Sequence, residues 1–376
     1  VLVVKESEGA SMNKFPQLFR HCNRLVLVAP VALSAAGIAA IASVSRTDKT
    51  FLTREVIIQS VALVIGLILV SVITYAGYRY FTDLEKPIYI FSMILLLSVY
   101  VPGLGTSLYG SRSWIDLGFI TIQPSEPVKI FFIILMSSYL SRCGDSPAKA
   151  RGAAAAALYA MPFILIVTKE DFGSGCVFCA IWIFMVFCSG LELRTICRLA
   201  LVFVSLIPIA YFFMAGYQKD RIDAFLKPGD LSLPGNYQVW NAKVAAGSGG
   251  LFGKGFMQGT QGALGFLPVP ESDFIFASFV EETGFFGGML IIGLFAFFLF
   301  ETLKIAKYAE DLQGTLIAAG LAGMFFFQAF ENIAMNMGLM PVTGITLPFV
   351  SCGGSSLISA MMGVGLLLSV SCRQKL

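Results

Sequence analysis

Histidine is almost absent from this chain of 376 residues, which contains only His21. Because that residue precedes the first apolar run, the sequence excludes catalytic triads, metal sites and proton relays that are built from histidine. Charged residues are also scarce, at 13% of the chain, and the formal net charge is only +3. So small a charge provides no basic footprint for nucleic acid, and we expect no nucleic-acid partner.

A nucleotide-binding loop is lacking too. The stretch GSGGLFGKG (residues 247–255) is rich in glycine, but Ser248 occupies the position of the first glycine in the phosphate-loop pattern. Gly255 follows Lys254 at the position where that pattern requires Ser or Thr. We therefore expect no nucleotide. Flexible backbone N–H groups beside Lys254, Lys243 and Arg221 suit an anionic head group instead.

Apolar residues, by contrast, make up 57% of the chain and include 34 phenylalanines, more than a soluble core can enclose. The sequence therefore predicts an all-α polytopic membrane protein with re-entrant and extracytoplasmic loop segments. Ten runs, three of them short, approach the roughly 20 residues that a helix needs to cross a bilayer. They cover residues 25–44, 56–76, 88–104, 128–142, 152–168, 174–190, 194–215, 273–301, 313–336 and 346–371.

These runs define a single membrane domain at residues 25–371, between a cytoplasmic N-terminal segment (1–24) and a cytoplasmic tail (372–376). An even number of spans places both termini on one side, and that side receives most of the lysines and arginines in the shorter loops. We therefore predict cytoplasmic termini and a long extracytoplasmic loop at about residues 216–272.

The eight cysteines do not form the pattern of a disulfide framework. Four fall at the predicted cytoplasmic edges of the spans, where thiols stay reduced, namely Cys22, Cys143, Cys197 and Cys372. Cys176 and Cys179 form a C-x-x-C inside an apolar run, without a second pair or a nearby histidine. We interpret these two as small packing residues rather than as a metal or redox site.

Unusual polar residues gather in the predicted outer loops. The segment GSRSWIDLGFITIQPSEPVKI (110–130) predicts an interfacial re-entrant stretch that leads into a helix capped by Ser125. Glu126 and Lys129 share a face of that helix and could pair within the membrane. The simpler alternative is Trp114 in an aromatic belt, followed by a capped helix. In TKEDFGSG (168–175), Asp171 and the glycines after it could simply form a turn between two spans.

The last outer loop, GLMPVTGITLPFVSCGGSSL (338–357), contains two prolines and repeated glycines. Non-helical backbone at membrane depth is tolerated only against protein or a water-filled cavity. This loop therefore indicates a cavity that opens outward, with a plain packing turn as the alternative.

Four carboxylates lie in PESDFIFASFVEETG (270–284), at the entry to an apolar run. On a helix, Asp273 and Glu281 differ by about 80° and can face one bundle interior, whereas Glu282 points nearly opposite to Asp273. An acid within a span costs about 2.5–3.5 kcal/mol unless it faces a cavity or a partner. Asp273 lies at the outer end of this run, where water can reach it. A carboxylate in such a place can act as a general base in a chain that has no suitable histidine. Glu281 and Glu282 fit a structural role as well as a functional one.

Five motifs occur in order along residues 25–370: GSRSWIDLGFITIQPSEPVKI, KEDFGSG, YQ followed by AAGSGGLFGKG, FLPVPESDFIFASFVEETGFFGG and MNMGLMPVTGITLPFVSCGGSSL. Together they resemble the successive signatures of the SEDS family (shape, elongation, division and sporulation), in particular its RodA and FtsW members. The MPVTGI form resembles RodA, the elongation member, more than the division member.

The resemblance implies a ten-helix peptidoglycan glycosyltransferase that polymerises lipid II at the outer face of the bacterial cytoplasmic membrane. It also implies partners: membrane lipids, a class B penicillin-binding transpeptidase, and the elongation or division machinery. The family's catalytic aspartate corresponds to Asp273. Its other motif positions correspond to Trp114, Glu126, Lys129 and Asp171, and our further substrate-binding candidates are Arg112, Arg221, Lys254 and Ser351.

The chain departs from the family pattern beside the catalytic aspartate. Glu271 and Ser272 replace the usual His-Thr, and Cys352 replaces a tyrosine in the last motif. Glu271 could raise the pKa of Asp273 as a neighbouring like charge, or it could help to hold a divalent cation such as Mg²⁺ or Mn²⁺. The supporting residues of the site would then be Glu271, Ser272, Glu281 and Glu282.

In the implied reaction, Asp273 accepts the proton of the acceptor 4-hydroxyl, and the anomeric carbon of the donor is inverted. Arg112, Lys129, Arg221 or a divalent cation would offset the charge of the departing pyrophosphate. Two other classes of function stay open. The protein could be a lipid II flippase, which needs a path to the cytoplasmic side, or an inactive scaffold for the transpeptidase.

Overall fold

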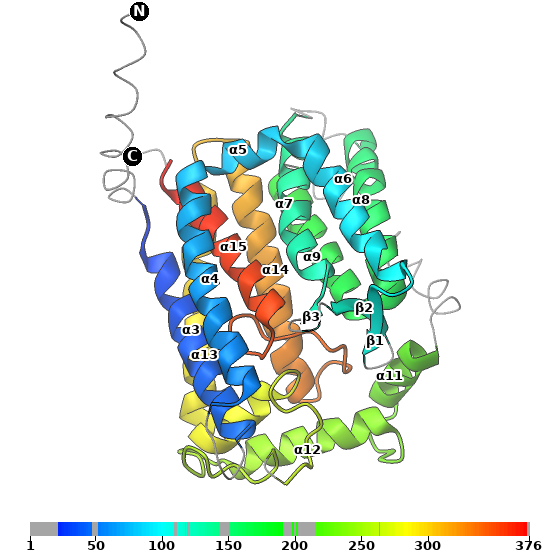
Figure 1. Ribbon diagram of the computed structural model, residues 1–376, viewed down its shortest axis with the longest axis vertical. Helices are drawn as coiled ribbons and strands as arrows, with labels where there is room; N and C mark the ends of the chain where they lie inside the picture. Colours follow the sequence, from blue (N-terminus) through cyan, green and yellow to red (C-terminus); the bar gives the residue numbers. More distant parts are fainter. Residues whose placement is uncertain are drawn as a thin grey trace, which may run out of the picture.

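The long helices run side by side in one bundle, as Figure 1 shows. The computed structural model describes residues 22–46, 52–108, 111–116, 118, 121–142, 150–190, 198, 201, 216–262 and 264–373. The first part of the bundle consists of α3 (Leu25–Val44), α4 (Arg54–Ala76), α5 (Tyr78–Asp83), α6 (Glu85–Leu97), α7 (Ser125–Arg142), α8 (Ala150–Glu170) and α9 (Phe172–Cys188). The second part consists of α11 (Gly216–Leu226), α12 (Pro234–Ser248), α13 (Ile275–Tyr308), α14 (Leu312–Asn336) and α15 (Gly354–Ser371).

The two ends of the bundle differ. The short helix α5 lies at one end, which we name the α5 end, and α12 lies across the opposite end, which we name the α12 end (Figure 1). Helix α14 lies inside the bundle, where it packs against α7, α9 and α13. Because α14 reaches the α12 end at its last turn, its final residues can support a site there.

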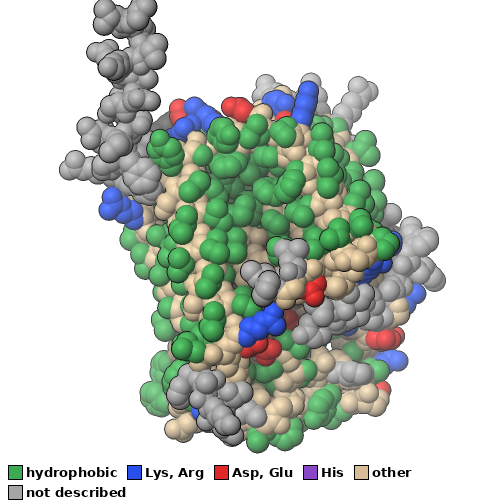
Figure 2. Space-filling view, viewed as in Figure 1, with side chains coloured by type: hydrophobic (Ala, Val, Ile, Leu, Met, Phe, Trp, Pro, Cys, Tyr) green, Lys and Arg blue, Asp and Glu red, His purple; other side chains and the backbone are tan. Residues whose placement is uncertain are grey.

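Five helices in the described part of the chain are long and apolar enough to cross a membrane: α3, α4, α13, α14 and α15. Helix α9 is shorter but also apolar. In Figure 2 the middle of the visible face is mostly apolar, and charged side chains gather at the α5 end and toward the α12 end. The structure thus confirms the predicted all-α polytopic membrane fold.

The predicted spans match the helices with three differences. The span at 273–301 ends too early, because α13 continues to Tyr308. The span at 88–104 is wrong at its end, because α6 stops at Leu97 and gives way to a 3₁₀ turn, η1 (Ser98–Tyr100). The span at 346–371 is wrong at its start, because α15 begins only at Gly354, after irregular backbone. The predicted span at 194–215 falls almost entirely outside the described residues, so the count of ten stays a prediction.

A small antiparallel sheet replaces the predicted re-entrant stretch. It contains β1 (Gly105–Leu108), β2 (Ser111–Asp116) and β3 (Thr121–Ile122) in the order β1-β2-β3. Thr106 pairs with Trp114, and Ile115 pairs with Ile122. These β-branched and aromatic residues fit a pleated surface better than a helix. Trp114 lies on β2, and the sheet lies in the half of the bundle nearer α12.

Helix α13 is broken at Gly284, where φ is 73° and ψ is −168°. The loop after α12 hydrogen-bonds to the backbone groups around the break: Phe285 N–H donates to the Gly250 carbonyl at 2.9 Å, and Lys254 N–H donates to the Glu281 carbonyl at 3.0 Å. Unpaired backbone is costly at membrane depth, so the loop stabilises the break. Only glycine fits here, because a Cβ on Gly284 would lie 2.3 Å from Gly253 N.

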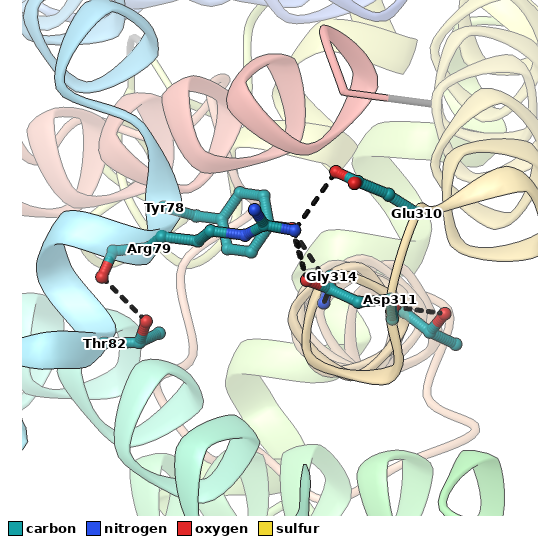
Figure 3. Close-up of polar contacts among 7 residues, drawn as sticks. Tyr78, Arg79, Thr82, Glu310, Asp311 and Gly314 are labelled. Carbon is teal, nitrogen blue, oxygen red and sulfur yellow. Dashed lines mark hydrogen bonds and ion pairs between the residues drawn. The ribbon is translucent and has the colours of Figure 1, made fainter. Parts of the chain in front are cut away.

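Polar contacts fasten the helices to one another at the α5 end (Figure 3). Arg79 bridges Glu310 at 3.1 Å and Asp311 at 2.9 Å, and the Tyr78 hydroxyl donates to Asp311 at 2.9 Å. Asp311 also caps α14 by accepting the Gly314 N–H at 2.8 Å. Burial raises the pKa of Asp311, but the hydrogen bonds from Gly314 and Arg79 outweigh it and lower that pKa.

One prediction about cysteine is wrong. The structure joins Cys22 to Cys372 in a disulfide, where the sequence predicted two reduced thiols. The reason is the closeness of the first turn of α3 to the last turn of α15, where Asn23 N–H also donates to Ser371 Oγ at 3.2 Å. Cys176 and Cys179 are free, as the packing interpretation requires, and Cys143 and Cys197 lie outside the described residues.

Candidate active site

A cavity of about 470 Å³ lies in the α12 half of the molecule. Its walls come from β2, the start of α9, α11, residues 268–274 and the irregular segment 341–346. Five predicted site residues line it, namely Trp114, Asp171, Arg221, Ser272 and Asp273. All five motifs, although far apart in the sequence, therefore contribute to one cavity.

Asp273 lies two residues before α13, and side chains of α14 fix its backbone. The Asp273 carbonyl accepts hydrogen bonds from the side-chain amides of Asn332 (3.1 Å) and Asn336 (2.9 Å). The Asn336 side-chain oxygen accepts the N–H of Ala277, in the first turn of α13, at 3.1 Å. The two asparagines contact only the backbone carbonyl of Asp273, so its side-chain carboxylate is left to line the cavity.

The Asp273 carboxylate is partly buried, and burial raises its pKa to about 6. Ser272 Oγ, which donates to Oδ1 at 3.1 Å, and the charge of Arg221 oppose that rise, whereas Asp171 and Glu271 add to it. A carboxyl group with this pKa is ionised at neutral pH and is more basic than an ordinary aspartate. It can therefore accept a proton from a substrate hydroxyl.

Arg221 on α11 lies near Asp273. Its Nη1 donates to the Thr343 carbonyl at 2.9 Å. A Cβ added to Gly344 would lie 3.8 Å from both Arg221 Nη1 and Asp273 Oδ2, so these two atoms are at most twice that distance apart. The cavity thus places the Asp273 carboxylate near a guanidinium that is suited to a phosphate.

Asp171 caps α9, as turn chemistry predicts, and also lines the cavity. It accepts the Ser174 N–H at 3.1 Å and the Ser174 hydroxyl at 2.7 Å. Its second oxygen also accepts a hydrogen bond from Gln123 Nε2 at 2.9 Å, which connects the start of α9 to the segment that leads into α7. Asp171 therefore orders one wall of the cavity.

Glu126 and Lys129 form the predicted ion pair, at 2.8 Å, with both side chains almost fully buried. The pair does not line the cavity. It lies beside a small void of about 10 Å³ between α7, α14 and α15, and Ser356 borders both the void and the cavity. The pair therefore supports the cavity wall rather than contacting its contents.

Lys254, Glu281 and Glu282 also lie away from the cavity. Lys254 Nζ contacts Glu281 Oε1 at 2.6 Å, and the same oxygen accepts the Thr260 N–H at 2.9 Å. Glu282 accepts a hydrogen bond from the Ser43 hydroxyl on α3. These groups hold the loop after α12 against α13, and α13 against α3. The contacts of the two glutamates therefore favour a structural role over a role in substrate binding.

Three further candidates do not line the cavity: Arg112, Glu271 and Ser351. Ser351 Oγ donates to the Ser272 carbonyl at 2.7 Å and accepts the Leu347 N–H at 2.8 Å, so it supports the segment that carries Asp273. The Glu271 carbonyl accepts the Cys352 N–H at 2.8 Å. Arg112 Nη2 lies 3.5 Å from the Val101 carbonyl.

Sequence reasoning missed the polar residues of α14. Gln328, Glu331, Asn332 and Asn336 are all buried, and the two asparagines hold the Asp273 backbone. Their spacing of three, one and four residues places them on one face of an otherwise apolar helix. That spacing was the signal in the sequence, because polar residues within a span face the interior of a bundle.

The divalent cation suggested by Glu271 beside Asp273 stays a prediction. Among the described residues, no three Asp, Glu, Cys or His side chains form a group that could hold a metal ion. Glu271 does not line the cavity beside Asp273. The two carboxylates therefore do not form a cation site by themselves.

Comparison with known proteins gives consistent results. Residues 21–376 match the model of a family described as cell cycle proteins, which covers FtsW, RodA and SpoVE. The chain is 34% identical to the peptidoglycan glycosyltransferase MrdB of Escherichia coli K12, over 95% of each chain. It is 37% identical to stage V sporulation protein E of Bacillus subtilis, over 86% of this chain and 88% of that one.

Two solved structures resemble the fold. The rod shape determining protein RodA of Thermus thermophilus matches with a TM-score of 0.70 at 27% identity, over 94% of this chain and 98% of that one. A chain from a study of polymerization and crosslinking by a peptidoglycan synthase complex matches with a TM-score of 0.78 at 28% identity, over 93% and 97%. The chain therefore belongs to the FtsW, RodA and SpoVE family, the SEDS family that its motifs indicate.

Proposed function

We propose that this chain is a peptidoglycan glycosyltransferase that polymerises lipid II, the disaccharide-peptide carried on undecaprenyl pyrophosphate. The observation that carries the proposal is the placement of the Asp273 carboxylate in the cavity, near Arg221 and between walls that contain Trp114 and Asp171. Relatives named as peptidoglycan glycosyltransferases, from Escherichia coli and Treponema pallidum, support the same activity for this chain.

In the proposed reaction, Asp273 accepts the proton from the 4-hydroxyl of the acceptor sugar. The acceptor oxygen forms a bond to the anomeric carbon of the donor, and the bond between that carbon and the pyrophosphate oxygen breaks. The configuration is inverted, and undecaprenyl pyrophosphate leaves with the electron pair. Arg221 offsets the charge that develops on the leaving group. Trp114 supplies an aromatic surface at the cavity wall.

The proposed orientation places both termini in the cytoplasm and the cavity at the outer face of the bacterial cytoplasmic membrane. Two observations support opposite sides for the termini and the cavity: α3 begins and α15 ends at the α5 end, and the cavity lies in the α12 half of the molecule. The lysines and arginines of the shorter loops favour the cytoplasm for the termini, whereas the Cys22–Cys372 disulfide at that end is unusual for a reducing compartment. We further propose a class B penicillin-binding transpeptidase as partner, within the elongation or division machinery, and membrane lipids around the bundle. The match to a chain of a peptidoglycan synthase complex supports this partner.

The test uses the purified chain, alone and with the transpeptidase, in vesicles that contain labelled lipid II. We expect glycan strands as product. Transfer of labelled lipid II between leaflets without any glycan product would instead identify a flippase. Neither product nor transfer, in a preparation that still binds the transpeptidase, would identify a scaffold.

A further inference from the structure

Glu331 is a buried acid that the reaction above does not use. It lies on α14, in a helix that is long and apolar enough to cross a membrane, and only 1% of its surface is exposed. Its Oε1 accepts a hydrogen bond from the Thr343 hydroxyl, and its Oε2 has no hydrogen-bond partner among the described residues. An acid within a span is costly, and it is a functional-site hypothesis by default.

The other buried acids of the described helices are explained by their partners. Glu126 pairs with Lys129, and Glu281 pairs with Lys254. Glu282 accepts a hydrogen bond from the Ser43 hydroxyl. Glu301 accepts a hydrogen bond from Asn23 and lies 3.8 Å from Lys304. Among the buried side-chain atoms that the structure describes, Glu331 Oε2 is the one carboxylate oxygen without a partner. Fastening two elements by an ion pair therefore does not explain Glu331.

Thr343 connects Glu331 to the cavity. Its hydroxyl donates to Glu331, and its carbonyl accepts Arg221 Nη1 at 2.9 Å. Thr343 belongs to the segment 341–346, which is neither helix nor strand and therefore needs support from its neighbours. The next residue of α14, Asn332, donates to the Ile345 carbonyl at 2.8 Å. Helix α14 thus holds this cavity wall at two adjacent points.

The charge of Glu331 is a second way in which it could act. Asp273, Arg221 and Asp171 lie within electrostatic range of Glu331. A neutral side chain of the same shape separates the two explanations. Glutamine keeps an oxygen that accepts the Thr343 hydrogen bond but carries no charge.

We propose that Glu331 is a positioning residue for glycan polymerisation: acting through Thr343, it holds the Arg221 guanidinium on the cavity wall near Asp273. This inference rests on the proposed function, because it assigns Glu331 a part in the same reaction. The carboxyl group restrains the Thr343 side chain and, with it, the carbonyl to which Arg221 donates. Without this restraint, Arg221 is less well placed to meet the departing pyrophosphate.

The test measures kcat and KM for lipid II with purified variants whose folding is checked by thermal unfolding. We expect Glu331→Ala and Thr343→Val each to lower kcat by about ten-fold, with KM changed by less than about two-fold, because the charge on the leaving group develops in the transition state. Glu331→Gln retains most of the activity. Adding Glu331→Ala to Arg221→Ala causes no further loss, since the two residues act as one unit.

Two results would overturn the inference. One is a Glu331→Gln enzyme as slow as Glu331→Ala, which would place the effect in the charge and not in the hydrogen bond. The other is a double variant whose losses multiply, which would mean that Glu331 acts independently of Arg221. If Glu331→Ala does not fold, Thr343→Val removes the same hydrogen bond from the other side. A fully active Arg221→Ala would refute the proposed role of Arg221 itself, whereas a slow Arg221→Ala beside a fully active Glu331→Ala would refute only this inference.

Discussion

Asp273 and Glu281 are eight residues apart, yet only one of them lines the cavity. Glu281 contacts Lys254 and the backbone N–H groups of Thr260 and Gln261, so its oxygens are fully engaged. The Asp273 carboxylate accepts a hydrogen bond from Ser272 and lines the cavity. At the scale of the residue, the contacts of each carboxylate therefore decide which one can accept a proton.

The pKa of Asp273 predicts the pH dependence of polymerisation. A general base must be ionised, so activity should fall as the pH drops through a midpoint near 6, the value to which burial raises this pKa. Glu271 adds to the rise as a nearby negative charge, so Glu271→Gln should move the midpoint to lower pH. The measurement is kcat/KM for lipid II across pH. A midpoint near that of an ordinary aspartate would contradict the account.

The sequence predicts Asp273 because its motif stands out at the entry to an apolar run. It does not reveal that Asn332 and Asn336 hold the backbone of Asp273, because these contacts join residues about sixty positions apart. It also places Lys254 in the site on the basis of charge alone. Only the fold shows that this ammonium group pairs with Glu281.

At the scale of the element, the break in α13 depends on close backbone contact with the loop after α12. Gly253 lies in that loop with φ of +81°, and a Cβ there would lie 2.0 Å from the Glu282 carbonyl oxygen. The loop and the broken helix therefore fit together only if this position has no side chain. The same loop is held by Glu281, which accepts hydrogen bonds from Lys254 Nζ and from the N–H groups of Thr260 and Gln261, and these contacts fix the register.

Gly253→Ala should therefore destabilise the protein by about 1–3 kcal/mol, the usual cost of a strained backbone position. Gly229→Ala is a matched control in the region between α11 and α12, since a Cβ on Gly229 would meet nothing within 4 Å. Thermal unfolding in detergent measures the effect. Equal unfolding temperatures for the two variants would show that the contact contributes little.

The helices were predicted well where a polar residue bounds an apolar run, as Asn23 does for α3 and Asp311 for α14. The start of α15 was predicted poorly because residues 345–350 are as apolar as a membrane-spanning helix. In the structure they form irregular backbone, next to the segment that carries Ser272 and Asp273. The disulfide between Cys22 and Cys372 was missed because it joins two ends of the sequence that only the bundle brings together.

At the scale of the whole molecule, the two ends of the bundle have different tasks. The α5 end is fastened by Arg79, Asp311 and the disulfide. The cavity of the candidate site and a second, more apolar cavity beside α12 and α13 both lie away from it. The α12 half carries irregular backbone, a small sheet and the cavity. The α5 end thus carries fastening contacts and the α12 half carries the cavity, an arrangement that suits an enzyme working at one face of a membrane.

The central claim is that Asp273 is the general base of glycan polymerisation, and Asp273→Asn tests it most directly. The measurement is the amount of glycan strand formed from lipid II by purified protein, with and without the transpeptidase. Asp230→Asn, an exposed carboxylate between α11 and α12, is the matched control. We predict that Asp273→Asn lowers the rate by about 100-fold or more, with normal folding, while Asp230→Asn keeps the wild-type rate. A folded Asp273→Asn protein that polymerises at the wild-type rate would contradict the account.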